Sequence, residues 1–404
     1  MCWKFTSCDV APTPPAFPSL LSMAEPLRLF ILAGEASGDR IGADLVRRLR
    51  QHTTVVARGV GGHELAAEGL SSLFPMTDLS VMGWSDVLLR LPLLLWRARQ
   101  TARAIRAGKS DIVVLIDAQV FSANVARQVR RHASDLPMLL YVAPSVWAWR
   151  PERARDLVPL FDEVLAVLPF EPRVMRELGG PPTHFVGHPA IGNSTMRPAQ
   201  PERGPLLLLP GSRKGELRRH LALMRAAAEG LQDHPRVSGF IVPTLPHLVS
   251  VIEAEVSGWP TKPVVVTGQA RDTAMQSAVA ALAVSGTITL ELALAGIPMV
   301  VTYVGDRGQA QRFARADNVP HIALPNIVAG REVVPELLFA AGVDPSRVAP
   351  ALIRLLDHPG VIAAQLEAFR EVRTLMEKGA PEAPLEDPAM CVLRRAAQRR
   401  SIGS

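Results

Sequence analysis

Two acidic residues in the first third of the chain stand directly after predicted buried strands. Glu35 comes two residues after the apolar run Leu27–Ala33, and Asp117 follows the run Ile112–Ile116. A carboxylate at the end of a strand is rigidly aimed and could take the proton from an attacking hydroxyl group. Asp117 could instead cap the next helix. Glu35 is harder to explain structurally, because a charge at this place is costly without a purpose.

The residues around Glu35 are small and polar, as in loops that bind ligands through backbone groups. Gly34 and Gly38 would let the backbone approach a ligand closely, and the helix that follows offers free N–H groups. Ser37 and Asp39 could contact the ligand, or could only satisfy the turn and cap the helix. The spacing is not GxGxxG, so it does not indicate a dinucleotide.

Two tryptophans and an arginine follow a further predicted strand, Met138–Val142. Trp147 and Trp149 offer flat apolar faces that suit a sugar ring or an acyl chain. Arg150, beside them, suits a phosphate group. The alternative is that the tryptophans pack in the core.

Two turns in the second half of the chain carry donors suited to a diphosphate. Gly211, Ser212 and Arg213 follow the predicted strand Leu206–Leu209 and stand at a helix start. An arginine there adds bidentate donors to the free N–H groups of the helix.

The second turn contains Ser285, Gly286 and Thr287 and follows the predicted strand Ala280–Val284. Glu291 lies about one turn into the helix, where it could accept hydrogen bonds from ribose hydroxyls while the turn holds phosphate. Ser and Thr caps are common, so this pattern is only moderately specific on its own.

These turns belong to a repeated order of strand, loop and helix, which predicts parallel strands joined by crossover helices. The sequence therefore predicts an α/β protein with two doubly wound, Rossmann-like domains that face a central cleft. In chain order we expect an extension over 1–22, an N-terminal domain over 23–187, a linker over 188–204, a C-terminal domain over 205–380 and a tail with a basic helix over 381–404.

Composition limits the possible partners and the compartment. The formal net charge of +6 favours an anionic partner, either nucleic acid, a phosphorylated substrate or an acidic membrane, unless it only reflects an arginine-rich genome. Cys2, Cys8 and Cys391 show no metal-ligand spacing and no disulfide framework, which fits a reducing cytoplasm. No run reaches the roughly 18 apolar residues that a membrane-spanning helix needs.

The stretch 79–99 has the composition of a segment that lies in a membrane interface, with leucine and tryptophan bordered by arginine. Arg90 and Pro92 argue against a spanning helix, and a buried core helix is the alternative. The residues expected at the membrane are Leu88, Leu89, Leu93, Leu94, Trp96 and Arg97.

Several of these segments together resemble lipid A disaccharide synthases, which are GT-B glycosyltransferases. The resemblance runs from about Leu27 to about Leu338. Its motifs are AGEASGD (33–39), VMG (81–83), IDA (116–118), APSVWAWR (143–150), LPFE (168–171), VGHP (186–189), LPGSR (209–213), SGT followed by LE (285–291) and LPNIVAGRE (324–332).

The resemblance implies transfer of a 2,3-diacylglucosamine unit from its UDP-sugar to the 6-hydroxyl of 2,3-diacylglucosamine 1-phosphate. The product would be a β(1→6) disaccharide 1-phosphate, formed with inversion and release of UDP. No metal or other cofactor and no nucleic acid is implied. Because both substrates carry acyl chains, the resemblance implies peripheral contact with the inner face of the cytoplasmic membrane. The sequence leaves the acyl lengths and the oligomeric state open.

The resemblance also implies roles for particular residues. Asp117 would be the base, with Glu35 as the competing candidate, and Arg213 with the turn at 285–287 would neutralise charge on the diphosphate. The residues expected to line the cleft near the nucleotide are Asn326, Arg331 and Glu332.

One departure from the family pattern follows Asp117. Family members commonly continue IDA with Pro-Asp-Phe-Asn, whereas this chain has Gln119, Val120, Phe121 and Ser122. A mechanism that needs a second acid is therefore in doubt, and more weight falls on Asp117. The stretch 303–307 also departs from the pattern of basic and aromatic residues that family members often have there.

Two other functions fit parts of the pattern. A UDP-sugar 2-epimerase shares the two-domain architecture but acts on water-soluble sugars. A catalytically altered homologue would bind UDP-sugar or lipid without turnover. Assays of UDP release with the two lipid substrates, and with UDP-N-acetylglucosamine, separate these alternatives from the synthase.

Overall fold

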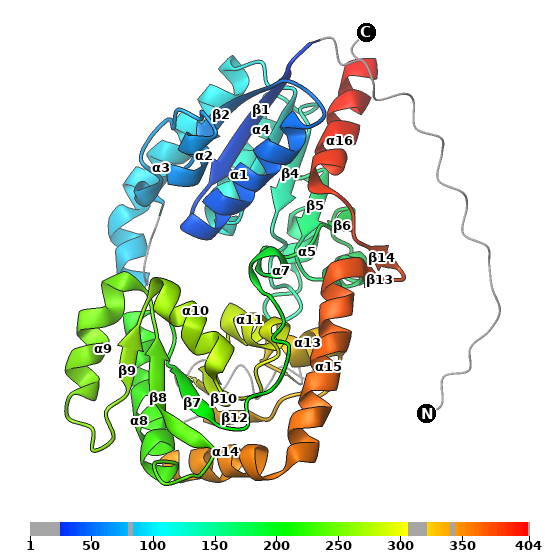
Figure 1. Ribbon diagram of the computed structural model, residues 1–404. Coiled ribbons are helices and arrows are strands. Elements are labelled where there is room, and N and C mark those ends of the chain that lie inside the picture. The colour runs from blue at the N-terminus through cyan, green and yellow to red at the C-terminus, as the bar shows by residue number, and fades with distance from the viewer. Residues whose placement is uncertain (1–24, 80–83, 306–320, 340–343, 403–404) are drawn as a thin grey trace, which may run out of the picture.

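The computed structural model describes residues 25–79, 84–305, 321–339 and 344–402. They form two lobes stacked one over the other, the N-terminal lobe above and the C-terminal lobe below in Figure 1. Each lobe is built on a six-stranded sheet. The predicted α/β architecture with two doubly wound domains is therefore confirmed, whereas the expected extension over 1–22 lies outside the described residues.

The sheet of the N-terminal lobe has the strand order β2-β1-β3-β4-β5-β6, and each neighbouring pair is parallel. Along β1, Leu29 and Ile31 belong to one apolar cluster, and Phe30 and Leu32 belong to another. Both faces of the sheet are therefore covered. The elements are β1 (Leu27–Ala33), α1 (Ala36–Arg50), β2 (Val55–Val60), α2 (His63–Ala67), α3 (Trp84–Ala107), β3 (Ile112–Ile116), α4 (Gln119–Arg130), β4 (Met138–Tyr141), α5 (Arg153–Asp156), β5 (Glu163–Ala166), α6 (Glu171–Glu177) and β6 (Thr183–Phe185).

The C-terminal lobe repeats this construction with the order β12-β11-β10-β7-β8-β9, again all parallel. Leu206 and Leu208 face one apolar cluster, and Leu207 and Leu209 face the other. The elements are β7 (Gly204–Leu209), α8 (Lys214–Gly230), β8 (Val237–Pro243), α9 (Val249–Val256), β9 (Val264–Val266), α10 (Gly268–Ser277), β10 (Ala280–Val284), α11 (Thr287–Ala295), β11 (Met299–Val304), α13 (Leu324–Ala329), β12 (Glu336–Phe339) and α14 (Val348–Asp357).

Each sheet has one topological switch point, where the chain leaves a central strand in one direction and returns on its other side. It lies between β1 and β3 in the N-terminal lobe and between β7 and β10 in the C-terminal lobe. In open α/β sheets, ligands bind outside the carboxyl ends of the strands at such points. The fold therefore marks the loops after these four strands as the places for a site.

Three strands were not predicted from the sequence, namely β2, β6 and β12. Each lies at the edge of its sheet. An edge strand is covered less completely than a central one, so its sequence can lack the continuous apolar run that marks a buried strand. In β2, the sequence VVARGV alternates between more and less exposed positions.

The predicted linker over 188–204 contains the short helix α7 (Ala190–Asn193) and is anchored to the C-terminal lobe. Arg197 is buried there, and its guanidinium donates hydrogen bonds to the carbonyl oxygens of Ala278 (2.5 Å) and Gly296 (2.7 Å). The connection is thus held against one lobe.

The C-terminal tail crosses back to the N-terminal lobe. Helix α15 (Pro359–Lys378) lies on the C-terminal lobe, and after the short strands β13 (Gly379–Ala380) and β14 (Ala383–Pro384) the helix α16 (Pro388–Ile402) packs on α1 (Figure 1). This helix lies in the segment 381–404, for which the sequence predicts a loop and a basic helix. Its arginines pair with acids of the N-terminal lobe: Arg395 with Asp162 (2.9 Å), Arg399 with Asp135 (3.2 Å) and Arg400 with Asp111 (2.6 Å).

Candidate active site

The loops after β1 and β3 lie in direct contact at the N-terminal switch point. Ala33 is the register partner of Ile116, so Gly34 and Asp117 are the next residues on neighbouring strands. A methyl group added to Gly34 would lie 2.5 Å from Cβ of Ala118. Only glycine therefore allows the two loops to come this close.

Glu35 and Ser37 are exposed at the start of α1. Glu35 is the N-cap residue, but its side chain makes no capping hydrogen bond. Its carboxylate therefore does not cap the helix, and Glu35 stays the second candidate for the base.

Asp39 has a structural task of its own. It is buried, and its carboxylate accepts hydrogen bonds from the backbone N–H groups of Gly62 (2.7 Å), Glu64 (2.8 Å) and Leu65 (3.2 Å). It therefore caps α2 rather than the helix on which it lies. We expect Asp39 to position the loop, not to contact the substrate as the sequence suggested.

Asp117 has a strained backbone. Its φ is 52° and that of Ala118 is 43°, values that residues other than glycine rarely adopt. The N–H of Asp117 donates to the carbonyl of Tyr141 (2.9 Å), and its own carbonyl accepts from the hydroxyl of Ser122 (2.8 Å). Unfavourable backbone conformations of this kind persist where many surrounding contacts hold them, and they are often found at functional sites.

Burial also changes the chemistry of Asp117. Its side chain is half-buried, and desolvation raises the pKa of the carboxyl group, although a hydrogen bond from the N–H of Ala118 acts in the opposite direction. A carboxylate with a raised pKa is a better proton acceptor than an exposed one. The end of β3 therefore holds a carboxylate that is rigidly placed and more basic than that of an exposed aspartate.

The loop after β4 joins the same edge. Val142, the next residue after the register partner of Ile116, has a φ of 76°. Trp147 is half-buried and meets Phe170 edge to face, with 5.5 Å between the ring centroids. Trp149 is exposed, and the guanidinium of Arg150 lies 5.5 Å from its ring centroid. Trp147 thus packs largely against the core of the protein, whereas Trp149 and Arg150 lie at the surface.

Glu171 of the LPFE motif was not singled out for a role from the sequence. Its carboxyl group is buried and accepts hydrogen bonds from the N–H groups of Val167 (3.2 Å) and Leu168 (3.0 Å). Burial raises its pKa to about 8. It ties the loop after β5 to α6, and only the fold shows that this acid points inward.

In the turn after β7, backbone N–H groups already donate hydrogen bonds to a carboxylate of the protein, that of Glu216. The carboxylate of Glu216 accepts hydrogen bonds from the N–H groups of Ser212 (2.9 Å) and Arg213 (3.2 Å), and Nη1 of Arg213 lies 3.1 Å from its other oxygen. Gly211 has a φ of 108°, which lets the backbone turn around this carboxylate. The side chain of Arg213 is 68% exposed, so it can reach a ligand beyond the turn.

The turn after β10 leaves its donors more open. Gly286 and Thr287 are exposed at the start of α11, and the hydroxyl of Ser285 donates to the carbonyl of Ile322 (2.7 Å). Glu291 forms an ion pair of 2.7 Å with Arg271 of α10. Arg271 was not found from the sequence, because no motif connects it with Glu291 before the fold is known.

The three residues expected beside the nucleotide behave differently from one another. Asn326 is fully buried. Its side-chain oxygen accepts hydrogen bonds from the N–H groups of Val333 (2.7 Å) and Val334 (2.8 Å), and its side-chain nitrogen donates to the carboxylate of Glu336 (2.7 Å). It holds the following loop, so the expectation that its side chain lines the cleft is wrong. Arg331 pairs with Glu371 of α15, and Glu332 is exposed.

The predicted membrane segment forms the helix α3, and its exposed apolar side chains are Leu91 (42%), Leu95 (36%) and Trp96 (51%). Leu94 packs against the core of the N-terminal lobe. Leu93 is partly buried, and the side chains of Leu88 and Leu89 lie outside the described residues. Of the exposed apolar side chains, only Trp96 was among the residues expected at the membrane, whereas Leu91 and Leu95 were not.

Arg97, expected at the membrane, is instead a structural residue. It pairs with Asp78 (2.7 Å), and its guanidinium lies between the rings of Phe74 (4.5 Å) and Trp96 (4.4 Å). In the described part of the chain, no helix has the length and apolar character needed to cross a bilayer.

An apolar cluster places the two sets of loops near each other. It contains residues of the N-terminal loops, such as Leu168 and the partly buried Trp147, together with Leu290 and Leu294 of α11 and Val328 of α13. Helix α11 starts at the turn that carries Ser285 to Thr287. The start of α11 therefore lies near the loops that follow β4 and β5 of the N-terminal lobe.

The chain is similar to proteins of one family along most of its length. The profile of the lipid-A-disaccharide synthetase family matches residues 29–375. Lipid-A-disaccharide synthases of Nitrobacter hamburgensis and Bradyrhizobium diazoefficiens are 43% and 41% identical over 377 and 381 residues. Each alignment covers 91% of this chain, and 95% and 97% of the respective relative.

Solved structures with a similar fold include a glycotransferase of kitacinnamycin (TM-score 0.56, 16% identity, 92% of this chain and 99% of that one) and MurG of Acinetobacter baumannii (0.53, 14%, 92% and 100%). A putative UDP-N-acetylglucosamine 2-epimerase from Listeria monocytogenes is also similar (0.55, 14%, 87% and 96%). At these identities the likeness concerns the fold alone, which is the GT-B fold.

The contact between the loops after β1 and β3 leads to a stability prediction. We expect Gly34→Ala to lower the free energy of unfolding by about 1–3 kcal/mol, because the new methyl group would overlap Ala118. Urea denaturation measures the change. Gly360→Ala, at a helical position with open space around it, is the matched control. An unchanged midpoint for Gly34→Ala would show that the loops are not packed as described.

Proposed function

The chain belongs to the lipid-A-disaccharide synthase family, and we propose that it transfers a 2,3-diacylglucosamine unit from UDP to 2,3-diacylglucosamine 1-phosphate. Membership makes it a glycosyltransferase of lipid A biosynthesis. The proposal adds the two substrates, inversion at the anomeric carbon and the residues that act. Its main support is that a half-buried carboxylate with a strained backbone and two phosphate-type turns occupy the switch points of the two sheets.

In the proposed reaction, the 6-hydroxyl of the acceptor gives its proton to the carboxylate of Asp117. The hydroxyl oxygen forms the new bond to the anomeric carbon while the bond from that carbon to the diphosphate breaks. UDP leaves with the bonding electrons. Attack from the side opposite the leaving group gives inversion, so the base and the diphosphate site must lie on different sides of the sugar. Their separation onto two lobes fits this requirement.

The diphosphate would be bound by the C-terminal lobe. Arg213 is exposed enough to reach it, and the N–H groups at the start of α11 point to the same kind of group. Glu291, which pairs with Arg271, would accept hydrogen bonds from the ribose hydroxyls. These fixed donors stabilise the charge that develops on the leaving group.

Replacing Asp117 tests the assignment of the base. We expect Asp117→Asn to lower kcat by about 100- to 10,000-fold with little change in KM, because only proton transfer is lost. UDP release with synthetic donor and acceptor measures this. Burial raises the pKa of Asp117, so wild-type turnover falls as the pH drops through that raised value, and the residual activity of the variant should lack this limb.

Two variants control this experiment. Asp44→Asn changes an exposed carboxylate that pairs with Arg48 and should leave turnover unchanged. Glu35→Gln tests the competing candidate. If Asp117→Asn turned over at nearly the wild-type rate while Glu35→Gln did not, Glu35 would be the base.

Replacing Arg213 tests the diphosphate site. We expect Arg213→Ala to weaken UDP binding about 10- to 100-fold, since a hydrogen bond to a charged group contributes about 1.5–3 kcal/mol. Titration calorimetry measures the Kd. Arg225→Ala removes an arginine of the same helix that pairs with Glu229 and serves as the matched control. Equal UDP affinity in both variants would move the diphosphate away from this turn.

Membrane contact through α3 is the second part of the proposal. Leu91 and Leu95 are exposed one helical turn apart, and Arg99 and Arg103 continue the same row. An exposed apolar row that ends in basic side chains suits the interface of an anionic bilayer. The lipid substrates would then reach the enzyme from that surface.

A paired substitution tests the membrane contact. We expect Leu91→Ser with Leu95→Ser to weaken binding to phosphatidylglycerol vesicles at least about tenfold, because each leucine loses part of the roughly 1.5–3 kcal/mol that its burial contributes. Vesicle co-sedimentation measures the binding, and the melting temperature should not change. Leu338→Ser, at a similarly exposed leucine, is the control. Unchanged vesicle binding by the paired variant would exclude α3 as the contact.

A further inference from the structure

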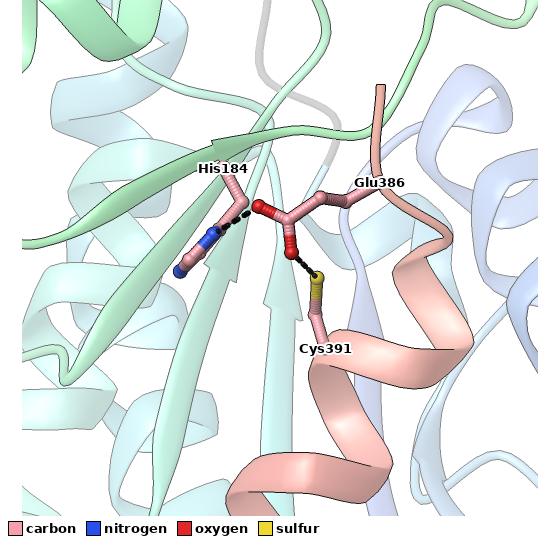
Figure 2. A group of neighbouring side chains, drawn as sticks. All are labelled: His184, Glu386 and Cys391. Atoms are coloured by element: carbon pink, nitrogen blue, oxygen red, sulfur yellow. Dashed lines mark hydrogen bonds and ion pairs between the residues drawn. The ribbon is translucent and has the colours of Figure 1, made fainter. Parts of the chain in front are cut away.

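A cluster of metal-binding side chains lies outside the candidate active site, where the tail meets the N-terminal lobe. It consists of His184 on β6 and of Glu386 and Cys391 on the tail (Figure 2). Nδ1 of His184 lies 2.7 Å from one oxygen of Glu386, and Sγ of Cys391 lies 3.6 Å from the other. One donor atom from each side chain lies within 4.8 Å of the others.

We propose that this cluster binds a zinc-type metal ion, with Nδ1 of His184, Sγ of Cys391 and a carboxylate oxygen of Glu386 as ligands. Imidazole, thiolate and carboxylate are the donors that Zn²⁺ takes in proteins, at about 2.0–2.3 Å. Tetrahedral bonds of this length separate the donor atoms by about 3.3–3.8 Å. The observed distances require only small side-chain movements to reach that range, and water can take the fourth position.

Glu163 on β5 supplies an independent argument for the metal. Its side chain is buried, and Oε2 has no hydrogen-bond partner among the described residues, although it lies 3.6 Å from Nε2 of His184. Histidines that bind a metal usually donate the other ring N–H to a carboxylate. Coordination through Nδ1 would place the proton of His184 on Nε2, directed toward the unpartnered oxygen.

The charges around the cluster balance when a divalent ion is present. The thiolate of Cys391 and the carboxylate of Glu386 neutralise its two positive charges. Arg394, whose Nη1 lies 3.2 Å from Glu386, offsets Glu163. Binding converts the thiol of Cys391 to a thiolate, and the proton passes to solvent. With these charges compensated, the partly buried site avoids the cost of an unpaired buried charge.

The location gives this metal a structural role. Glu386 lies in the connection from α15 on the C-terminal lobe to α16, Cys391 lies in the first turn of α16, and His184 belongs to the N-terminal sheet. The ion would therefore fasten the tail to the N-terminal lobe. A ligand that binds only the folded state stabilises it by mass action.

The experiment uses the full chain with Cys2→Ser and Cys8→Ser, so that Cys391 is the single thiol. We expect Co²⁺ to bind once per chain and to give a thiolate-to-cobalt charge-transfer band in the near ultraviolet, which Zn²⁺ then removes. Saturating Zn²⁺ should raise the melting temperature by about 3–5 °C. Cys391→Ser should abolish the band, and His184→Gln should weaken Zn²⁺ binding at least tenfold.

Two further variants complete the test. Glu163→Gln should keep the band but weaken Zn²⁺ binding about 10- to 100-fold, as loss of an outer carboxylate does. His358→Gln, at an exposed histidine of the C-terminal lobe, should bind like the parent. If Cys391→Ser does not fold, Cys391→Ala replaces it. Absence of a charge-transfer band in the folded parent, or unchanged Zn²⁺ affinity in the Cys391 variant, would overturn the proposal, whatever the result of the turnover assays.

Discussion

The parallel pairing of β1 with β3 is the constraint on which the N-terminal half of the candidate site depends. Parallel strands end at the same edge, and a register that pairs Ala33 with Ile116 puts Gly34 and Asp117 side by side. The helices that follow these strands cover opposite faces of the sheet, so the edge between them stays open to a ligand. The same construction in the C-terminal lobe presents the turns after β7 and β10.

The strand ends at this edge are held in conformations that would be unfavourable elsewhere. Asp117, Ala118 and Val142 all have positive φ values, each at a typical cost of about 1–3 kcal/mol. Hydrogen bonds from neighbouring strands, such as that from the N–H of Asp117 to Tyr141, fix them. The sheet thereby fixes the backbone of Asp117 before a substrate binds, as the role proposed for this residue would require.

The lobes are joined by more than the linker. Residues of α11, α13 and α15 share one apolar cluster with the loops of the N-terminal lobe, and α16 returns to pack on α1. The basic charge of the tail is largely used in this return, because Arg395, Arg399 and Arg400 pair with acids of the N-terminal lobe. The net positive charge of the chain is therefore a poor guide to where an anionic ligand binds.

The sequence by itself determined the α/β class, the two-domain plan, the central strands and the loops of the candidate site, because buried runs and small-residue turns are local patterns. It did not determine which polar side chains in those loops are free. Asp39, Asn326 and Arg97 were expected to contact ligands or lipid, yet each forms hydrogen bonds within the protein. The partners of Asp39 lie 23 to 26 residues away in the sequence, those of Asn326 lie 7 to 10 residues away, and Asp78, the partner of Arg97, lies 19 residues away. The cluster of His184, Glu386 and Cys391 spans 202 residues between His184 and Glu386, so only tertiary packing could assemble it. Helices, strands and turns follow from local sequence patterns. Which side chains form hydrogen bonds with each other depends on the tertiary structure, because it brings distant segments of the chain together.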